Sequence, residues 1–311
     1  MDTEVRGVDV TVAATEAAER LDTYMAATFS GITRSHARRL VHEHRVTVND
    51  AACKPGQPIH PADVVRIQLP EEPGPPQAER IPVATIYEDR DIVVVDKPPG
   101  MVVHPAPGHN RHTLVNALLN SYPDIRCGEV NRPGIVHRLD KDTSGIVVVA
   151  RHTEAKDWLV GQFKEGAVHK VYLALVAGDI AVGGTIDTPI GRHPTHRKRM
   201  AVVPGGRSAL THYSPLEQFD NYTLLEVHPV TGRTHQIRVH LASIGHAVAG
   251  DRTYGRRAKW HDLEPALRRH FLHAASLTLT LNAPRKSITF TSPLPQDLQD
   301  VLHHLREHTK Q

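Results

Sequence analysis

The stretch GIVHRLDKDTSGIVVVAR, residues 134–151, joins a polar loop to a continuous apolar strand. Asp140 lies in the loop, with Arg138 two residues before it and Asp142 two residues after it. A carboxylate on a loop that is anchored by a buried strand is well positioned to act as a nucleophile. Repulsion between the Asp140 and Asp142 carboxylates would raise the pKa of one of them, whereas Arg138 or Lys141 would lower it. A structural ion pair or a turn cap is the alternative role for such an aspartate.

Outward from this stretch, the chain contains many short strands and few helices. The patterns predict strands at 92–96, 145–151, 170–176, 222–228, 276–281 and 287–291. They predict helices at 153–164 and 234–243, because a glycine follows each at 166 and 245. Strands outnumber helices, and the regular strand–helix alternation of a doubly wound sheet is missing. The sequence therefore predicts an α+β domain on a largely antiparallel, mixed sheet.

A proline-rich segment separates this domain from a smaller unit before it. Residues 69–80 read LPEEPGPPQAER, in which four of twelve residues are proline. Such a segment supports neither a helix nor a central strand. We therefore expect a small N-terminal α/β domain at 1–70, a linker at 71–80 and the larger domain at 81–311.

The small unit shows helical and strand periodicities of its own. Apolar residues at helical spacing predict two helices, the first with Leu21, Tyr24, Met25 and Phe29, the second capped by Thr33 with Ala37, Leu40, Val41 and His44 on its apolar side. Alternating apolar residues predict strands at 46–48 and 65–69, with a turn at Asn49-Asp50.

Composition excludes several classes of protein. The apolar runs of the 311-residue chain are a few residues long, whereas a membrane span needs roughly 18 or more. The first ten residues carry three acids and no apolar run, which argues against a secretory signal and for a cytoplasmic protein. Cys53 and Cys127 stand far apart, so neither a disulfide framework nor a zinc ribbon is expected.

The net charge is only +3, but basic residues gather in two places. The first cluster contains Arg34, Arg38, Arg39 and Arg45 against the single Glu43. The second contains Arg192, Arg197, Lys198, Arg199 and Arg207 without an acid. Each cluster alone is compatible with an ordinary solvated face. Because basic clusters attract polyphosphate, the two together favour a structured nucleic acid as the partner.

Four motifs in this chain resemble those of the RluA/RluD-type pseudouridine synthases. The string HRLDKDTSG with the strand IVVVAR resembles the catalytic motif of that family, whose nucleophilic aspartate corresponds to Asp140. The other three are DKPPGMVVHP at 96–105, KVYLALVAG at 170–178 and TGRTHQIRVHLASIGHAVAGD at 231–251. The resemblance implies catalytic roles for Tyr172, which packs against the target base, and for Arg238, which lies near the aspartate. Residues 15–70 resemble the RNA-binding domain named after ribosomal protein S4.

The resemblance implies an RNA pseudouridine synthase with the fold of that family. Asp140 would attack the uracil ring or the anomeric carbon, Arg238 would keep it charged, and Arg138 would fill the space that the extruded uridine leaves. RNA contacts are expected from Arg34, Arg38, Arg39, Arg197, Lys198 and Arg199. The chemistry needs no cofactor and no metal, and we expect a monomer.

The motif set favours large-subunit ribosomal RNA as the substrate. Transfer RNA is the alternative substrate. An RNA-binding ribosome-assembly factor without the chemistry and a metal-dependent RNA hydrolase are the alternative functions.

Overall fold

The computed structural model describes residues 8–69, 74–106, 109–196, 199–255, 260, 263, 267–282 and 284–308. The chain divides into two compact units, Met1–Gly74 and Pro75–Gln311. Residues 70–73, which include the start of the expected linker at 71, lie outside the described residues. Each unit has its own apolar core.

The first unit pairs two helices with a four-stranded antiparallel sheet. Its elements are β1 (Val8–Ala13), α1 (Leu21–Thr28), α2 (Arg34–His42), β2 (Val46–Val48), β3 (Ala51–Ala52) and β4 (Val64–Leu69), with sheet order β1-β4-β2-β3. Thr33 caps α2 as expected, because its side chain accepts a hydrogen bond from the His36 N–H at 3.2 Å. Asn49 and Asp50 form the β2–β3 turn with φ of 53° and 61°.

The expectation that His44 continues the apolar stripe of α2 is wrong. The helix ends at His42, and His44 adopts a φ of 56° with an exposed side chain. Its departure from helical geometry breaks the spacing on which the expectation rested. Ala37, Leu40 and Val41 do pack into the core as predicted.

The second unit is built on a nine-stranded sheet in the order β5-β6-β7-β14-β8-β13-β12-β9, with β15 beside β14. The strands are β5 (Ala84–Glu88), β6 (Ile92–Lys97), β7 (Ser144–Ala150), β8 (His169–Ala177), β9 (Gly184–Asp187), β12 (Leu210–Phe219), β13 (Tyr222–Pro229), β14 (Leu272–Thr280) and β15 (Ser287–Thr291). Among these described strands, β7 and β14 pair in parallel and the other pairs are antiparallel. A separate hairpin contains β10 (Ile190–Arg192) and β11 (Met200–Val202). The predicted α+β class with a largely antiparallel sheet is confirmed.

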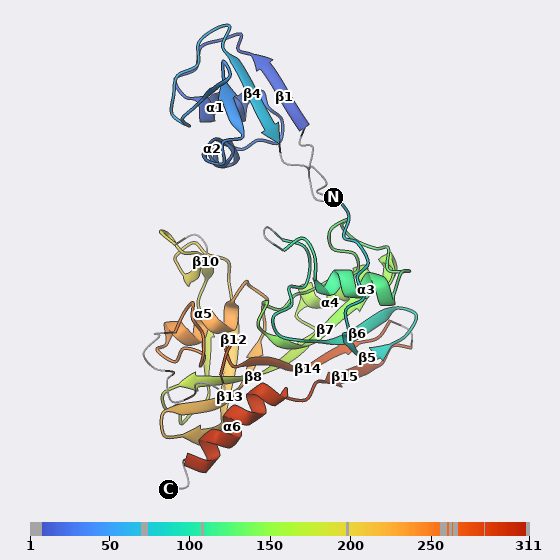
Figure 1. Cartoon of the computed structure of the whole chain (residues 1–311). Helices are drawn as coiled ribbons and strands as arrows, with labels where there is room; N and C mark the ends of the chain where they lie inside the picture. Colours follow the sequence, from blue (N-terminus) through green and yellow to red (C-terminus); the bar gives the residue numbers. More distant parts are fainter. Residues whose placement is uncertain are drawn as a thin grey trace. The chain divides into compact units, whose positions relative to one another are not determined.

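Helices cover both faces of this sheet. They are α3 (Leu114–Ser121), α4 (Thr153–Glu165), α5 (Gln236–Ser243) and α6 (Gln296–His308). Alternate side chains of β7 pack against α4 and against α3, so its apolar run has no period of two. In the same way α6 and α5 take opposite sides at β8 and β13, and Figure 1 shows α6 crossing this end of the sheet.

Some sequence-based expectations for helices and strands differ from the structure. Helix α5 begins at Gln236, two residues later than expected, because His235 has a left-handed φ of 57°. Strand β14 begins at Leu272, four residues earlier than expected. Strand β1, whose residues were not among the expected strands, pairs along its whole length with β4.

Candidate active site

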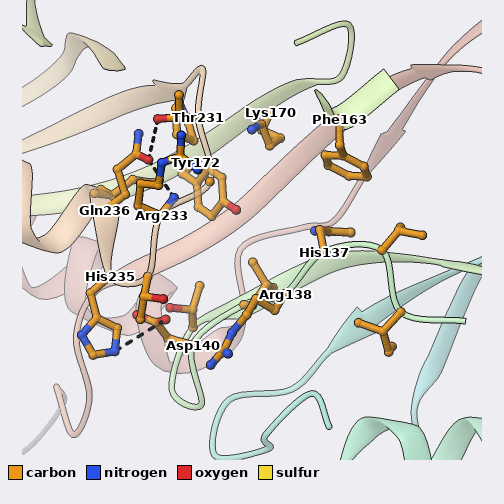
Figure 2. Close-up of a pocket in the computed structure, with 18 of the residues that line it drawn as sticks. His137, Arg138, Asp140, Phe163, Lys170, Tyr172, Thr231, Arg233, His235 and Gln236 are labelled. Atoms are coloured by element: carbon orange, nitrogen blue, oxygen red, sulfur yellow. Dashed lines mark hydrogen bonds and ion pairs between the residues drawn. The ribbon is translucent and has the colours of Figure 1, made fainter. Parts of the chain in front are cut away.

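One pocket of about 550 Å³ opens in the second unit. This volume falls within the roughly 300–1,000 Å³ of sites that enclose a small ligand. Its walls come from the loop before β7, the start of β8, helix α4 and the turn between β13 and α5. Arg138, Asp140, Tyr172 and Arg238 all line it, so the structure brings these sequence-predicted residues together. Figure 2 shows Arg138, Asp140 and Tyr172 around the pocket.

The loop that carries Asp140 is fixed at both ends. Leu139 is buried, and the Thr143 N–H donates to the Asp140 carbonyl at 3.1 Å. The Lys97 ammonium, fully buried at the end of β6, donates to the Lys141 carbonyl at 3.1 Å. A β-carbon on Gly145 would overlap the backbone of β14, so the loop enters β7 at a position that requires glycine. These contacts fix the position of the Asp140 carboxylate.

Arg238 joins two carboxylates. Its Nη1 donates to Asp140 Oδ2 at 2.9 Å, while Nε and Nη2 donate to the two oxygens of Asp251 at 2.7 and 2.9 Å. Asp251 is fully buried and also accepts from the Thr253 and Tyr254 N–H groups. The expected Arg238 contact with Asp140 is present. Its second partner, Asp251, was not predicted from the sequence.

Asp140 is held in its charged form. Burial alone would raise the pKa of Asp140, but His235 and Arg238 outweigh it and lower that pKa below its usual value. Burial also lowers the pKa of His235, so this ring is neutral at pH 7 and Arg238 supplies the stabilising charge there. Arg138 and Lys141, which the sequence suggested for this role, are not among its main causes. The Asp140 side chain remains 16% exposed toward the pocket, as a nucleophile requires.

Tyr172 lies on the wall beside this carboxylate. Its ring packs between two core clusters, one containing Leu139 and the other Ile237. Burial, with a contribution from Asp140, raises the pKa of Tyr172, so the phenol stays neutral. Within the described ranges, no protein group hydrogen bonds to its hydroxyl. The hydroxyl is therefore available to a ligand.

The turn before α5 supplies pocket residues that sequence reasoning missed. His235 Nε2 lies 3.9 Å from Asp140 Oδ1, and its Nδ1 lies 2.8 Å from the Tyr254 hydroxyl. Gln236 accepts hydrogen bonds from the Thr231 hydroxyl and the Arg233 N–H, which closes the turn. The motif at 231–251 contains Thr231, Arg233, His235 and Gln236, but their convergence with Asp140 and Tyr254 depends on the tertiary fold.

The sequence-predicted RNA contacts fall into separate places. Arg138 is exposed at the pocket rim. Arg34 and Arg38 lie on α2 with their Nε atoms 3.4 and 3.9 Å from the buried Asp22 carboxylate. Arg39, on the same helix, lies 3.9 Å from Glu43. Arg199 is exposed just before β11, while Arg197 and Lys198 lie outside the described residues.

Among the residues that the structure describes, no group of three or more His, Cys, Asp or Glu side chains is arranged to hold a metal ion. Within the same ranges, no helix is long and apolar enough to cross a membrane.

Both parts of the chain match known protein families. The RNA pseudouridylate synthase family matches residues 91–243, and the S4 domain matches residues 19–65. The chain is 49% identical to an uncharacterized RNA pseudouridine synthase of Chloroflexus aurantiacus, over 96% of this chain and 93% of that protein. It is 43% identical to ribosomal large subunit pseudouridine synthase D of Nitrosomonas europaea, over 96% and 88%.

A solved structure agrees with these matches. Human RNA pseudouridylate synthase domain containing 1 is 28% identical, with a TM-score of 0.55 over 74% of this chain and 96% of that one. The resemblance inferred from the four motifs and from the N-terminal unit is thus confirmed. The chain belongs to the RNA pseudouridine synthases, the isomerases that convert uridine to pseudouridine in RNA, and carries an S4 domain before its catalytic domain.

Proposed function

We propose that this protein isomerises uridine to pseudouridine in large-subunit ribosomal RNA, with Asp140 as the nucleophile. The observation that carries the proposal is a carboxylate held charged by Arg238 at 2.9 Å, beside Tyr172, in a pocket of about 550 Å³. Relatives named ribosomal large subunit pseudouridine synthase D, 39–43% identical over most of the chain, support the ribosomal substrate.

The reaction breaks the bond between N1 of uracil and C1′ of ribose and forms a bond between C5 and C1′. The C5 proton leaves and N1 gains a proton, so the reaction involves no net oxidation and needs no redox cofactor. Asp140 attacks either the uracil ring or the anomeric carbon. Both routes require an ionised carboxylate, and Arg238 keeps Asp140 ionised by lowering its pKa.

Tyr172 binds the extruded base, and Arg138 occupies the space that the base vacates. Stacking of the extruded uracil on the Tyr172 ring contributes about 1–3 kcal/mol, which offsets part of the unstacking cost. The neutral Tyr172 hydroxyl faces the base as a hydrogen-bonding group. Arg138, exposed at the rim, enters the position that the uridine leaves.

We assign the RNA contacts outside the pocket to two basic segments of the chain. Arg34, Arg38 and Arg39 on α2 belong to the S4 domain, and Arg197, Lys198 and Arg199 belong to the segment between β10 and β11. Two basic segments in different units of the chain suit a folded RNA that contacts both. We also propose that the protein acts as a monomer, and a ribosomal substrate supports a cytoplasmic location.

Pseudouridine profiling of total RNA from a strain that lacks the protein tests the proposal. We expect loss of one or more large-subunit sites, restored by the wild-type protein and not by Asp140→Asn. Loss confined to transfer RNA would reject the ribosomal substrate. Unchanged profiles in all RNA, together with a ribosome-assembly defect that Asp140→Asn corrects, would favour an assembly factor.

A further inference from the structure

Lys170 is a pocket cation that the chemistry described above does not use. It lies on β8 two residues before Tyr172, so the two side chains project from the same face of the sheet. Residues two positions apart in a strand are separated by roughly 7 Å, so Lys170 is the neighbour, on the same strand face, of the Tyr172 ring on which the uracil stacks. Its Nζ lies 3.5 Å from the Val230 carbonyl oxygen.

An apolar and aromatic surface borders Lys170. Figure 2 shows Phe163 and His137 on the side of the pocket away from His235. The Phe163 and His137 rings stack with centroids 4.9 Å apart, and Val160 on α4 is 41% exposed. His137 Nε2 accepts a hydrogen bond from the Val148 N–H, which leaves the ring neutral and fixed. This surface, formed by Val160, Phe163 and His137, suits one face of a nucleobase.

Lys170 has no acidic partner among the residues that line the pocket. The pocket's two carboxylates are Asp140, which Arg238 pairs, and Glu129, which is 76% exposed and lies 3.8 Å from Arg132. The other titratable or charged side chains that line the pocket are His104, Arg132, His137, Arg138, Lys156, Lys164, Tyr172, Arg233, His235 and Arg238. Burial lowers the pKa of Lys170 to about 8. An anion beside Lys170 would favour its charged form and raise that pKa.

We propose that Lys170 binds the backbone phosphate of a nucleotide adjacent to the target uridine, while Val160, Phe163 and His137 receive the base of that nucleotide. The inference rests on the proposed function, because it places the uracil on Tyr172. A uracil at Tyr172 brings its sugar-phosphate backbone toward the next side chain on the same strand face. The pocket thus recognises a short single-stranded segment rather than one isolated base.

The test compares Lys170→Arg, Lys170→Met and the control Lys286→Met, whose exposed lysine is not among the pocket residues. The probe is an unmodified transcript of the organism's large-subunit RNA, bound to the full chain. From pH 7.0 to 8.5 a group with a pKa of about 8 loses most of its proton, so wild-type affinity should fall about fourfold. Lys170→Arg should lack this fall, because arginine stays charged.

Lys170→Met should bind more weakly at pH 7.0, with a salt-dependence slope reduced by about 0.7, while Lys286→Met behaves like the wild type. Every variant retains Lys97, whose pKa of about 7 also lies near this range, so its titration cancels in the comparison. Lys170 is half-buried and has no acidic partner in the pocket, so methionine in its place should not impair folding, and an unchanged melting temperature would verify this.

A neutral methylphosphonate placed at each phosphate beside the modified uridine locates the contact. At one position it should weaken wild-type binding and leave Lys170→Met unaffected. Equal pH dependence in the wild type and Lys170→Arg, or additive losses at every position, would overturn the inference. Pseudouridine formation by the wild type is measured in parallel: its absence refutes the proposed function, whereas its presence with uncoupled losses refutes the Lys170 contact alone.

Discussion

Replacing Arg238 with methionine removes the cation that joins Asp140 to Asp251. Methionine keeps much of the apolar stem of the side chain and deletes all three hydrogen bonds to the carboxylates. Two carboxylates then share a buried region without a counter-charge. Removal of one partner of a buried ion pair typically costs about 3–5 kcal/mol, so we expect a clearly lower melting temperature.

The same change alters the chemistry in a pH-dependent way. Without Arg238, less positive charge opposes the burial that raises the pKa of Asp140, so the carboxyl becomes protonated at higher pH than in the wild type. We expect single-turnover pseudouridine formation at least about a hundredfold slower at pH 7, because the nucleophile loses both its charge and its fixed position. The rate should rise with pH over the range in which the wild-type Asp140 is already ionised.

Single-turnover rates and melting temperatures from pH 6 to 8 provide the assay. The double variant Arg238→Met with Asp251→Asn separates the two effects: the amide removes the second orphaned charge and can still accept from the Thr253 and Tyr254 N–H groups. It should regain stability without regaining rate. A normal rate in Arg238→Met, or a reduced rate with no dependence on pH beyond that of the wild type, would refute the proposed role of Arg238.

Three further results are expected. Burial lowers the folded-state pKa of Lys97 to about 7, so between pH 7 and about 10 the unfolded chain binds one more proton than the folded chain. Denaturant titrations should therefore show the stability of the wild type rising with pH relative to Lys97→Met, and parallel pH curves would contradict this. Deletion of residues 1–74 should leave a cooperatively melting catalytic unit that binds RNA more weakly, and an insoluble or molten fragment would argue against independent folding. Alanine at both Arg34 and Arg38 should reduce the salt-dependence slope of RNA binding by about 0.7–0.9 per phosphate contact and leave the single-turnover rate at saturating protein unchanged. An unaltered slope would show that neither residue contacts the RNA.

Much of the catalytic fold follows from local sequence signals. The apolar run at 146–150 predicts a strand, and the structure gives the reason for its lack of alternation, since both of its faces are buried. Gly166 ends α4 with a φ of 74°, as the glycine stop predicts. The grouping of Asp140, Tyr172 and Arg238 came from the family resemblance, because the residues alone left a structural role for Asp140 open.

Other features depend on contacts that no local pattern contains. Asp251 and Arg238 lie thirteen residues apart and meet only because the chain turns back after α5. Lysine side chains are seldom fully buried, yet Lys97 is, because three backbone carbonyls accept hydrogen bonds from its ammonium. Lys170 is a pocket residue only because the pocket's other walls come from distant segments of the chain.

The most direct measurement of the central claim is pseudouridine formation on an unmodified large-subunit RNA transcript by the purified full chain and by Asp140→Asn. The amide preserves the shape of the side chain and deletes the nucleophile. We predict site-specific pseudouridine with the wild type, none above background with Asp140→Asn, and RNA affinity within about twofold of the wild type for the variant. Appreciable turnover by Asp140→Asn would contradict Asp140 as the nucleophile.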